Sequence, residues 1–143
     1  MAIEVLDREG IMKVLPHRDA MLLLDEAALN EDGTAEGRYH VRGDEWFLQG
    51  HFPGNPVVPG VIQCEIIAQA SCMLMKDAIP GATPYYAGIN NVRFRRPVRP
   101  GDTLVVHSEL VRSKMNLYVV KAEAAVDGQV CAAGEFIFMI AKQ

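Results

Sequence analysis

The sequence predicts an α+β fold in which a mostly antiparallel sheet wraps around one long central helix. One apolar segment, residues 61–79, is long enough for a helix and has apolar residues on nearly every side. About six other segments carry the alternation or the turn signals of strands. Since a single buried helix needs a sheet to cover it, these elements fit one domain spanning residues 1–143.

The first forty residues predict a short helix followed by two strands. Residues 4–15 have the character of a helix that ends before Pro16. Residues 20–30 predict a strand, and the Glu-Asp-Gly turn at 31–33 leads into a second strand that ends near Arg42.

The next twelve residues, QGHFPGNPVVPG (49–60), hold three glycines and three prolines and predict a rigid loop. The segment VIQCEIIAQASCMLMKDAI (61–79) follows without interruption and stops at Pro80. From Pro59 to Ile79 a helix would span roughly 30 Å. The loop therefore delivers His51 to the start of the most apolar helix in the chain.

The rest of the chain predicts strands at 85–96, 102–112, 114–126 and 129–141, with a hairpin turn at Asp127-Gly128. Alternation supports two of them: Leu104, Val106 and Leu110 share one face, as do Tyr118, Val120, Ala122 and Ala124. Such a sheet leaves an edge strand, which predicts pairing with a second copy.

Composition indicates a globular protein without a metal site. Hydrophobic residues make up 50% of the chain, charged residues 22%, and the net charge of −4 gives no reason to expect nucleic acid or an anionic membrane as a partner. The three cysteines form no CxxC pair or Cys/His cluster, so reduced thiols and a cytoplasmic location are expected. Acidic residues near the start and the lack of a 20-residue apolar run predict neither secretion nor membrane insertion.

Two ionisable residues flank the start of the predicted helix, His51 before it and Glu65 inside it. A carboxylate among apolar neighbours is costly unless it is paired, protonated or functional. Glu65 could instead face solvent, and His51 could be a structural loop residue. Together they favour an acid–base site, and the backbone N–H of Gly60 at the positive end of the helix could stabilise an oxyanion. Alternatively, Pro59-Gly60 only starts the helix.

Three segments resemble the FabZ-type beta-hydroxyacyl-acyl-carrier-protein dehydratases in order and spacing. They are LPHRDAMLLLDE (15–26), QGHFPGNPVVPGVIQCEIIAQA (49–70) and YYAGINNVRFRRPVRPGDTL (85–104). The resemblance implies the hotdog fold and removal of water from a (3R)-hydroxyacyl thioester of acyl carrier protein, giving a trans-2-enoyl thioester in fatty acid biosynthesis. It also implies that no metal or organic cofactor takes part.

The resemblance also implies roles for individual residues. His51 matches the catalytic base and Glu65 the acid, contributed by different subunits of a homodimer or of a trimer of dimers. Gly60 matches the N–H that holds the thioester carbonyl, and the carbonyl of Val57 matches the group that orients the histidine ring. Tyr85 aligns with a tyrosine that gates the acyl tunnel in some relatives. Phe52 and Gln69, beside the pair in the loop and on the helix, are expected to contact substrate.

Four of the 14 basic residues lie within seven positions: Arg93, Arg95, Arg96 and Arg99. The rest of the chain has 10 basic and 18 acidic residues, so it is clearly acidic. The four arginines predict a docking patch for an acidic carrier protein and its phosphopantetheine, or else a solvated strand edge. Nucleic acid is the poorer partner because no aromatic stacking pattern accompanies them.

Other functions on the same fold stay open: a thioesterase, an acyl-CoA hydratase, a dehydratase that also isomerises the double bond, or a non-catalytic acyl-thioester-binding module. The last would be expected to lack an intact His/Glu pair. Ser71, Cys72 and Asn90 depart from the usual residues of the family, and the first two could alter the acyl tunnel and its chain-length preference. Cys64 beside Glu65 is also unusual, and it is expected to be a buried apolar thiol.

Overall fold

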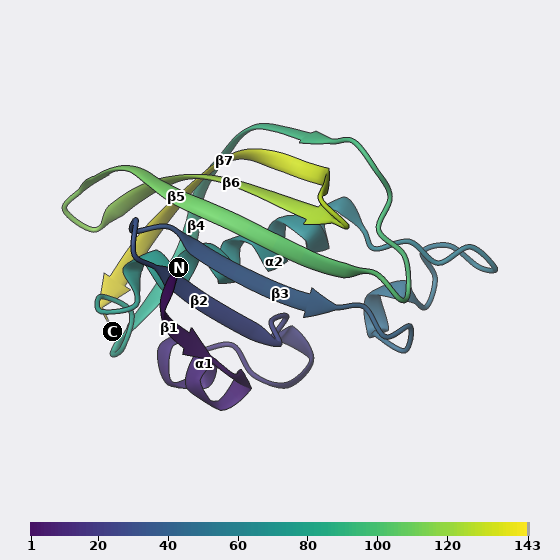
Figure 1. Cartoon of the computed structure of the whole chain (residues 1–143), viewed down its shortest axis with the longest axis horizontal. Helices are drawn as coiled ribbons and strands as arrows, with labels where there is room; N and C mark the ends of the chain where they lie inside the picture. The colour runs from purple at the N-terminus through teal and green to yellow at the C-terminus, as the bar shows by residue number, and fades with distance from the viewer. Residues whose placement is uncertain (143) are drawn as a thin grey trace.

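The sheet has seven strands among the described residues, one more than the sequence predicts, and all neighbouring strands are antiparallel. A computed structural model describes residues 1–142 (Figure 1). The strands are β1 (Ala2–Leu6), β2 (Glu26–Asn30), β3 (Ala35–His40), β4 (Ala82–Phe94), β5 (Thr103–Lys114), β6 (Leu117–Val126) and β7 (Gln129–Lys142). Their order is β1-β2-β3-β5-β6-β7-β4, so β1 and β4 form the two edges.

The central helix α2 (Gly60–Ser71) is shorter than the predicted segment 61–79, and a 3₁₀ turn, Cys72–Met75, continues it. Its 12 residues span about 18 Å. The hydroxyl of Ser71 donates a hydrogen bond to the carbonyl oxygen of Ile67 at 2.8 Å. A serine that bonds back one turn in this way competes with the helix backbone, which favours the tightening seen here.

Helix α2 lies in the curl of the sheet, behind β3, β5 and β6 in Figure 1. Its side chains Ile66 and Ile67 are fully buried. The helix approaches β3 so closely that a Cβ on Gly37 would lie 2.5 Å from the Cβ of Ala70. Glycine is therefore required at this contact, and the predicted arrangement of a sheet wrapped around one helix is confirmed.

The N-terminal prediction of one helix over residues 4–15 is wrong for residues 4–7. Strand β1 pairs with β2, and α1 (Arg8–Val14) begins only after Asp7, whose side chain accepts a hydrogen bond from the N–H of Gly10 at 2.9 Å. Asp7 is thus an N-cap that separates strand from helix. The predicted strand 20–30 is likewise only half strand: its first part holds a 3₁₀ turn, Asp19–Met21, and β2 starts at Glu26.

The predicted alternation of the C-terminal strands is largely confirmed. Leu104 and Val106 of β5 are fully buried, whereas Leu110 is 43% exposed beside an irregular pairing of β5 with β6. The predicted set on β6 faces the core: Val120, Ala122 and Ala124 are buried, and Tyr118 packs against the core.

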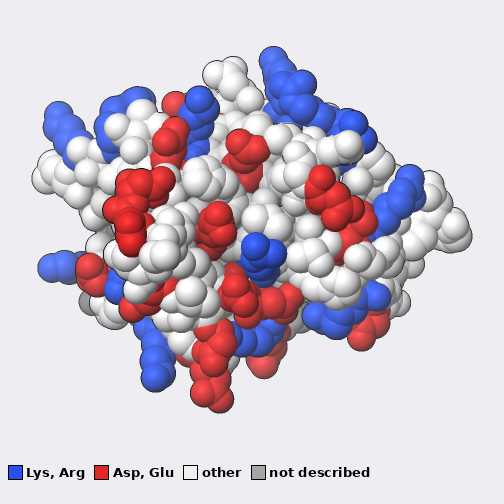
Figure 2. Space-filling model, in the orientation of Figure 1, with Lys and Arg blue, Asp and Glu red and all other residues white. Residues whose placement is uncertain are grey.

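Charged side chains of both signs are scattered over the face seen in Figure 2, between larger areas of other residues. Basic side chains project along its upper edge, where β4 ends and the β5–β6 turn lies. None of the helices within residues 1–142 is long and apolar enough to cross a membrane.

Candidate active site

His51 is held in a tight double turn. Its N–H donates to the carbonyl of Leu48 at 3.3 Å, and its carbonyl accepts from the N–H of Val57 at 2.8 Å. Inside this turn, Phe52 and Asn55 exchange two backbone hydrogen bonds, at 3.1 and 2.8 Å. The glycines and prolines therefore form a closed loop in which the backbone around the imidazole is fixed.

The imidazole itself is oriented by the loop. Its Nδ1 lies 2.9 Å from the carbonyl oxygen of Val57, which can only accept, so Nδ1 carries the proton in this contact. The ring of Phe52 stacks on the imidazole, with 4.1 Å between the ring centroids, and Phe52 is 53% exposed. In the neutral ring, Nε2 is then the basic nitrogen.

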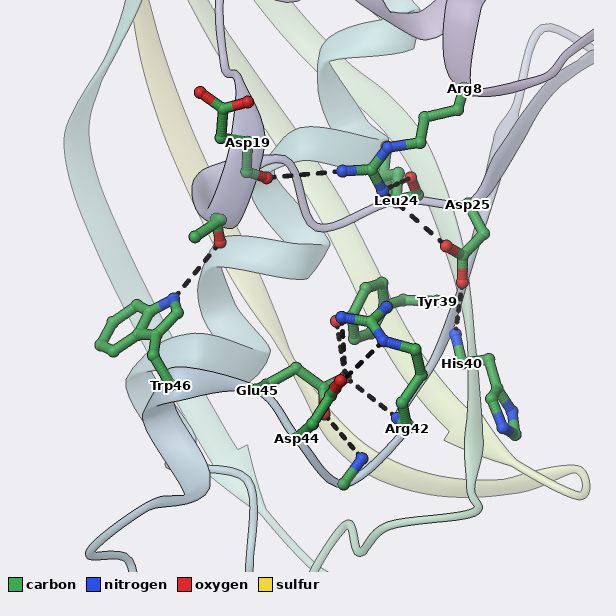
Figure 3. A network of polar contacts seen from close by, with 12 residues as sticks. Arg8, Asp19, Leu24, Asp25, Tyr39, His40, Arg42, Asp44, Glu45 and Trp46 are labelled. Atoms are coloured by element: carbon green, nitrogen blue, oxygen red, sulfur yellow. Dashed lines mark hydrogen bonds and ion pairs between the residues drawn. The ribbon is translucent and has the colours of Figure 1, made fainter.

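A buried carboxylate anchors the chain just before this loop (Figure 3). Glu45 accepts hydrogen bonds from the hydroxyl of Tyr39 at 2.7 Å and from the backbone N–H groups of Arg42 at 3.0 Å and Gly43 at 2.8 Å. Burial opposes ionisation of Glu45, yet these hydrogen bonds outweigh it and lower the pKa of the carboxyl. The next residue, Trp46, donates from its indole N–H to the carbonyl of Ala20 at 3.3 Å.

The start of α2 opens into a cavity of about 390 Å³. Its lining includes His51, Val57, Gly60 and Gln63 from the loop and the helix, and Phe94, Arg95 and Arg96 from the end of β4 and the residues after it. The first backbone N–H groups of a helix have no partner within the helix. A Cβ on Gly60 would lie 3.1 Å from the ring of Phe94, so the absence of a side chain keeps this helix end close to the aromatic ring. The imidazole and the helix N-terminus therefore share one cavity.

Glu65 does not line the cavity that Gly60 and Gln63 line. It lies on another face of α2, one turn before Gln69. Its Oε2 accepts a hydrogen bond from Nε2 of Gln69 at 3.0 Å and lies 3.3 Å from Nε2 of His17. His17 was not predicted as a site residue, although it lies in the quoted segment LPHRDAMLLLDE. No periodicity links residues 48 positions apart, so the sequence carried no signal for this contact.

The Gln69 side chain is fully buried, and its hydrogen bonds go to the protein. Its Oε1 accepts from the N–H of Leu23 at 2.8 Å, and its Nε2 donates both to Glu65 and to the carbonyl of Met21 at 2.8 Å. Both amide hydrogens are thereby used. Gln69 ties the carboxylate of α2 to the segment that precedes β2.

A small cavity of about 70 Å³ lies beside Glu65. It is lined by His17, Glu65, Ala68, Gln69, Cys72, Pro84, Tyr86 and Phe138. The predicted gate, Tyr85, is not among these residues and is 55% exposed, whereas Tyr86 stacks on Phe138 and donates from its hydroxyl to the carbonyl of Cys64 at 2.6 Å. Neighbouring residues of a strand point to opposite faces, so only one of the two tyrosines can face this cavity.

The thiols near this cavity are poor nucleophiles. Burial, with a smaller contribution from Glu65, raises the pKa of Cys72 to about 12 and also raises that of Cys64. Both cysteines are buried and form no disulfide. Cys64 is thus the buried thiol expected from the sequence. Within residues 1–142 no group of His, Cys, Asp and Glu side chains could hold a metal ion.

The four predicted docking arginines line two neighbouring hollows and make one loop contact. Arg95 and Arg96 line the His51 cavity, while Arg93 and Arg95 also line an open groove of about 470 Å³ across β4–β7 that contains Glu109, Glu123 and Glu135. Arg99 instead donates from its guanidinium to Oδ1 of Asn55 at 2.6 Å, which fastens the His51 loop to the segment after β4.

The model of the FabA-like domain family matches residues 15–135 of this chain. Among curated proteins, the chain is 46% identical over 135 residues to the 3-hydroxyacyl-[acyl-carrier-protein] dehydratase FabZ of Caldicellulosiruptor bescii, covering 92% of this chain and 96% of that protein. It is 44% identical over 133 residues to the FabZ protein of Oenococcus oeni, covering 91% and 96%.

Solved structures share the fold at low sequence identity. The dehydratase heterocomplex ApeI:P from Xenorhabdus doucetiae superposes with a TM-score of 0.81 at 20% identity, over 93% of this chain and 91% of that one. The uncharacterized protein PH1136 from Pyrococcus horikoshii gives a TM-score of 0.71 at 17% identity, over 100% and 96%. These neighbours confirm the predicted hotdog fold.

Proposed function

This chain belongs to the FabA-like domain family, and from that premise we propose that His51 and Glu65 carry out the dehydration of 3-hydroxyacyl groups bound to acyl carrier protein. The reaction, a hydro-lyase step of fatty acid biosynthesis, is the one named for relatives that match nearly the whole chain. The observation that carries the assignment of residues is the pair of cavities on α2. One holds an oriented imidazole at the helix N-terminus, and the other holds a carboxyl group.

His51 is the base. Because Val57 accepts from Nδ1, Nε2 is free to take the proton from the carbon alpha to the thioester carbonyl. The electrons of that C–H bond form the new double bond, and negative charge develops on the carbonyl oxygen. Backbone N–H groups at the start of α2, Gly60 first, stabilise this charge together with the helix dipole.

Glu65 is the acid. It donates a proton to the beta-hydroxyl as the C–O bond breaks, so the hydroxyl leaves as water. Nε2 of Gln69 and Nε2 of His17 both lie close to Oε2 of Glu65, so Oε2 is the oxygen that accepts hydrogen bonds from the protein. The proton given to substrate is therefore placed on Oε1, and Gln69 and His17 act as positioning residues rather than as contacts to substrate.

The complete site requires two copies of the chain. His51 and Glu65 line separate cavities, so a substrate held at the start of α2 needs a carboxyl from elsewhere. Strand β4 offers the contact, because it is a 13-residue edge strand and carries the exposed apolar side chains Tyr85, Ile89 and Phe94. A two-fold axis beside β4 would form two equivalent sites, and a trimer of such dimers would keep both.

The carrier protein docks beside the His51 cavity. Arg95 and Arg96 at its rim supply positive charge for an acidic carrier and the phosphate of its arm. The reaction needs neither metal nor organic cofactor, because the two side chains and the helix end supply the acid, the base and the oxyanion site. We assign residues 1–143 to a single domain, and the free thiols support a cytoplasmic location.

Mixing two inactive variants tests the shared site. His51→Ala and Glu65→Gln proteins are unfolded together, refolded and assayed on a 3-hydroxyacyl thioester. In a random mixture, half of the dimers are mixed and each has one intact site, so about a quarter of the wild-type activity is expected. Each variant refolded alone is the control. Turnover no higher than that of the controls, in a mixture shown to contain mixed dimers, would refute the shared site.

A further inference from the structure

Gln63 is a buried polar residue for which the proposed chemistry gives no role. It lies in α2 one turn after Gly60 and is only 3% exposed, yet it lines the cavity of His51. Its Oε1 is buried and has no hydrogen-bond partner among residues 1–142. Leaving such an oxygen unpaired is unfavourable, so a ligand that supplies a donor would recover free energy.

The geometry of the helix places this side chain near the substrate. Side chains of an α-helix lean toward its N-terminus, so the long side chain of Gln63 extends back toward the level of Gly60. A thioester whose carbonyl binds at Gly60 therefore has its nearest atoms beside the Gln63 amide. Arg95 and Arg96 also line this cavity and attract negative charge.

The unpaired group is an acceptor, so the ligand must present an N–H or O–H. The beta-hydroxyl does not meet this need, because in the proposed mechanism it is engaged by the carboxyl group that a second copy of the chain brings to the site. The phosphopantetheine arm of the carrier protein (the carrier arm) supplies such a donor. It has a secondary amide two carbons from the thioester sulfur and a phosphate farther on. A side-chain amide can both accept from and donate to such a group.

We propose that the side-chain amide of Gln63 binds the amide of the carrier arm nearest to the thioester. This inference rests on the proposed function, since it assumes that the thioester carbonyl binds at the start of α2. Gln63 would then select substrates by their arm, while His51 and Glu65 act on the acyl group.

Two small substrates that differ in one group provide the test. Both carry the same 3-hydroxyacyl chain, one on N-acetylcysteamine and the other on 2-acetoxyethanethiol, in which an ester oxygen replaces the N–H. Wild-type protein is expected to prefer the amide by about 3- to 10-fold in kcat/KM, because one neutral hydrogen bond contributes about 0.5–1.5 kcal/mol. Gln63→Met, similar in size but without polar hydrogen-bonding groups, should lose this preference. Gln49→Met, the same change at an exposed loop position, should keep it.

The outcomes are distinguishable. Wild-type protein that acts equally on both substrates, or a Gln63→Met variant that keeps the preference, would overturn the role of Gln63 and leave the proposed function intact. Wild-type protein that dehydrates neither substrate nor carrier-bound substrate would overturn both. An altered oligomeric state of Gln63→Met with the preference retained would assign Gln63 to a contact between subunits and refute the proposal.

Discussion

The two halves of the candidate site are built in opposite ways. On the His51 side, backbone hydrogen bonds of a loop fix the residue at the edge of a wide cavity of about 390 Å³. On the Glu65 side, the residue lies in the middle of a helix and lines a cavity of about 70 Å³. It is held by Gln69, one turn along the same helix and itself bonded to the segment before β2, and by His17 from that distant part of the chain. The base is thus positioned by local sequence and the acid by tertiary structure, so substitutions of supporting side chains should affect the acid far more.

The largest effect is expected when the acid itself is changed. Glu65→Gln keeps the size and a polar head but cannot donate the proton, so kcat should fall by about 10²–10⁴-fold. Turnover is measured on correctly assembled protein, with the exposed Glu31→Gln as the matched control. Activity within about twofold of wild type would remove Glu65 from the mechanism.

The next largest effects are expected from changing the residues that hold Glu65 in place, Gln69 and His17. Gln69→Met removes the acceptor for the N–H of Leu23, whose hydrogen bond to Gln69 is buried, and this loss should cost about 1–3 kcal/mol in the free energy of unfolding. Chemical denaturation measures this loss. His17→Phe removes a contact to Glu65 without unpairing any backbone group, so it should lower kcat several-fold and change stability less. Equal stability of the Gln69→Met variant and wild type would contradict the assigned network.

The contacts around Glu65 and His51 show which parts of the fold and of the site the sequence could predict. Its composition and alternation predicted the wrapped helix and most strands, and the spacing of glycine and proline around His51 predicted a rigid loop. Contacts of Glu65 with His17 and of Gln69 with Met21 and Leu23 join segments more than 40 residues apart, so no local pattern encodes them. The cap at Asp7 is a single carboxylate hydrogen bond, and a hydroxyl hydrogen bond of Ser71 accompanies the early end of α2. The helical pattern of apolar residues signals neither.

A smaller effect should sharpen the comparison from the His51 side. Arg96→Glu should raise KM for carrier-bound substrate several-fold at low salt, where attraction is least screened, and much less at high salt. The same acyl group on a small pantetheine thiol should show little change. Arg112→Glu, an equal change of charge on the exposed β5–β6 hairpin, is the control. Equal losses on both substrates would make Arg96 structural.

The smallest effect concerns the anchor before the loop. The hydrogen bonds to Glu45 lower its pKa in the folded state, so its ionised form stabilises the protein above the pKa of the unfolded carboxyl, roughly pH 4, and this contribution is lost as pH falls through the lower folded value. Thermal unfolding followed from neutral pH to pH 3 should show a shallower decrease for Glu45→Gln than for wild type. Parallel pH profiles would show that Glu45 does not stabilise through its charge.

The position of β4 has a consequence for synthesis on the ribosome. In the part of the sheet that the structure describes, β4 pairs with β7 alone, and β7 is the last strand of the chain. At about 5–20 residues per second, the roughly 50 residues that separate the end of β4 from the end of β7 take several seconds to add. During that time β4 has neither edge paired, and its exposed aromatic side chains are open to contact with other nascent chains. Addition of β7 pairs one edge of β4 and leaves its other edge for the proposed contact with a second copy.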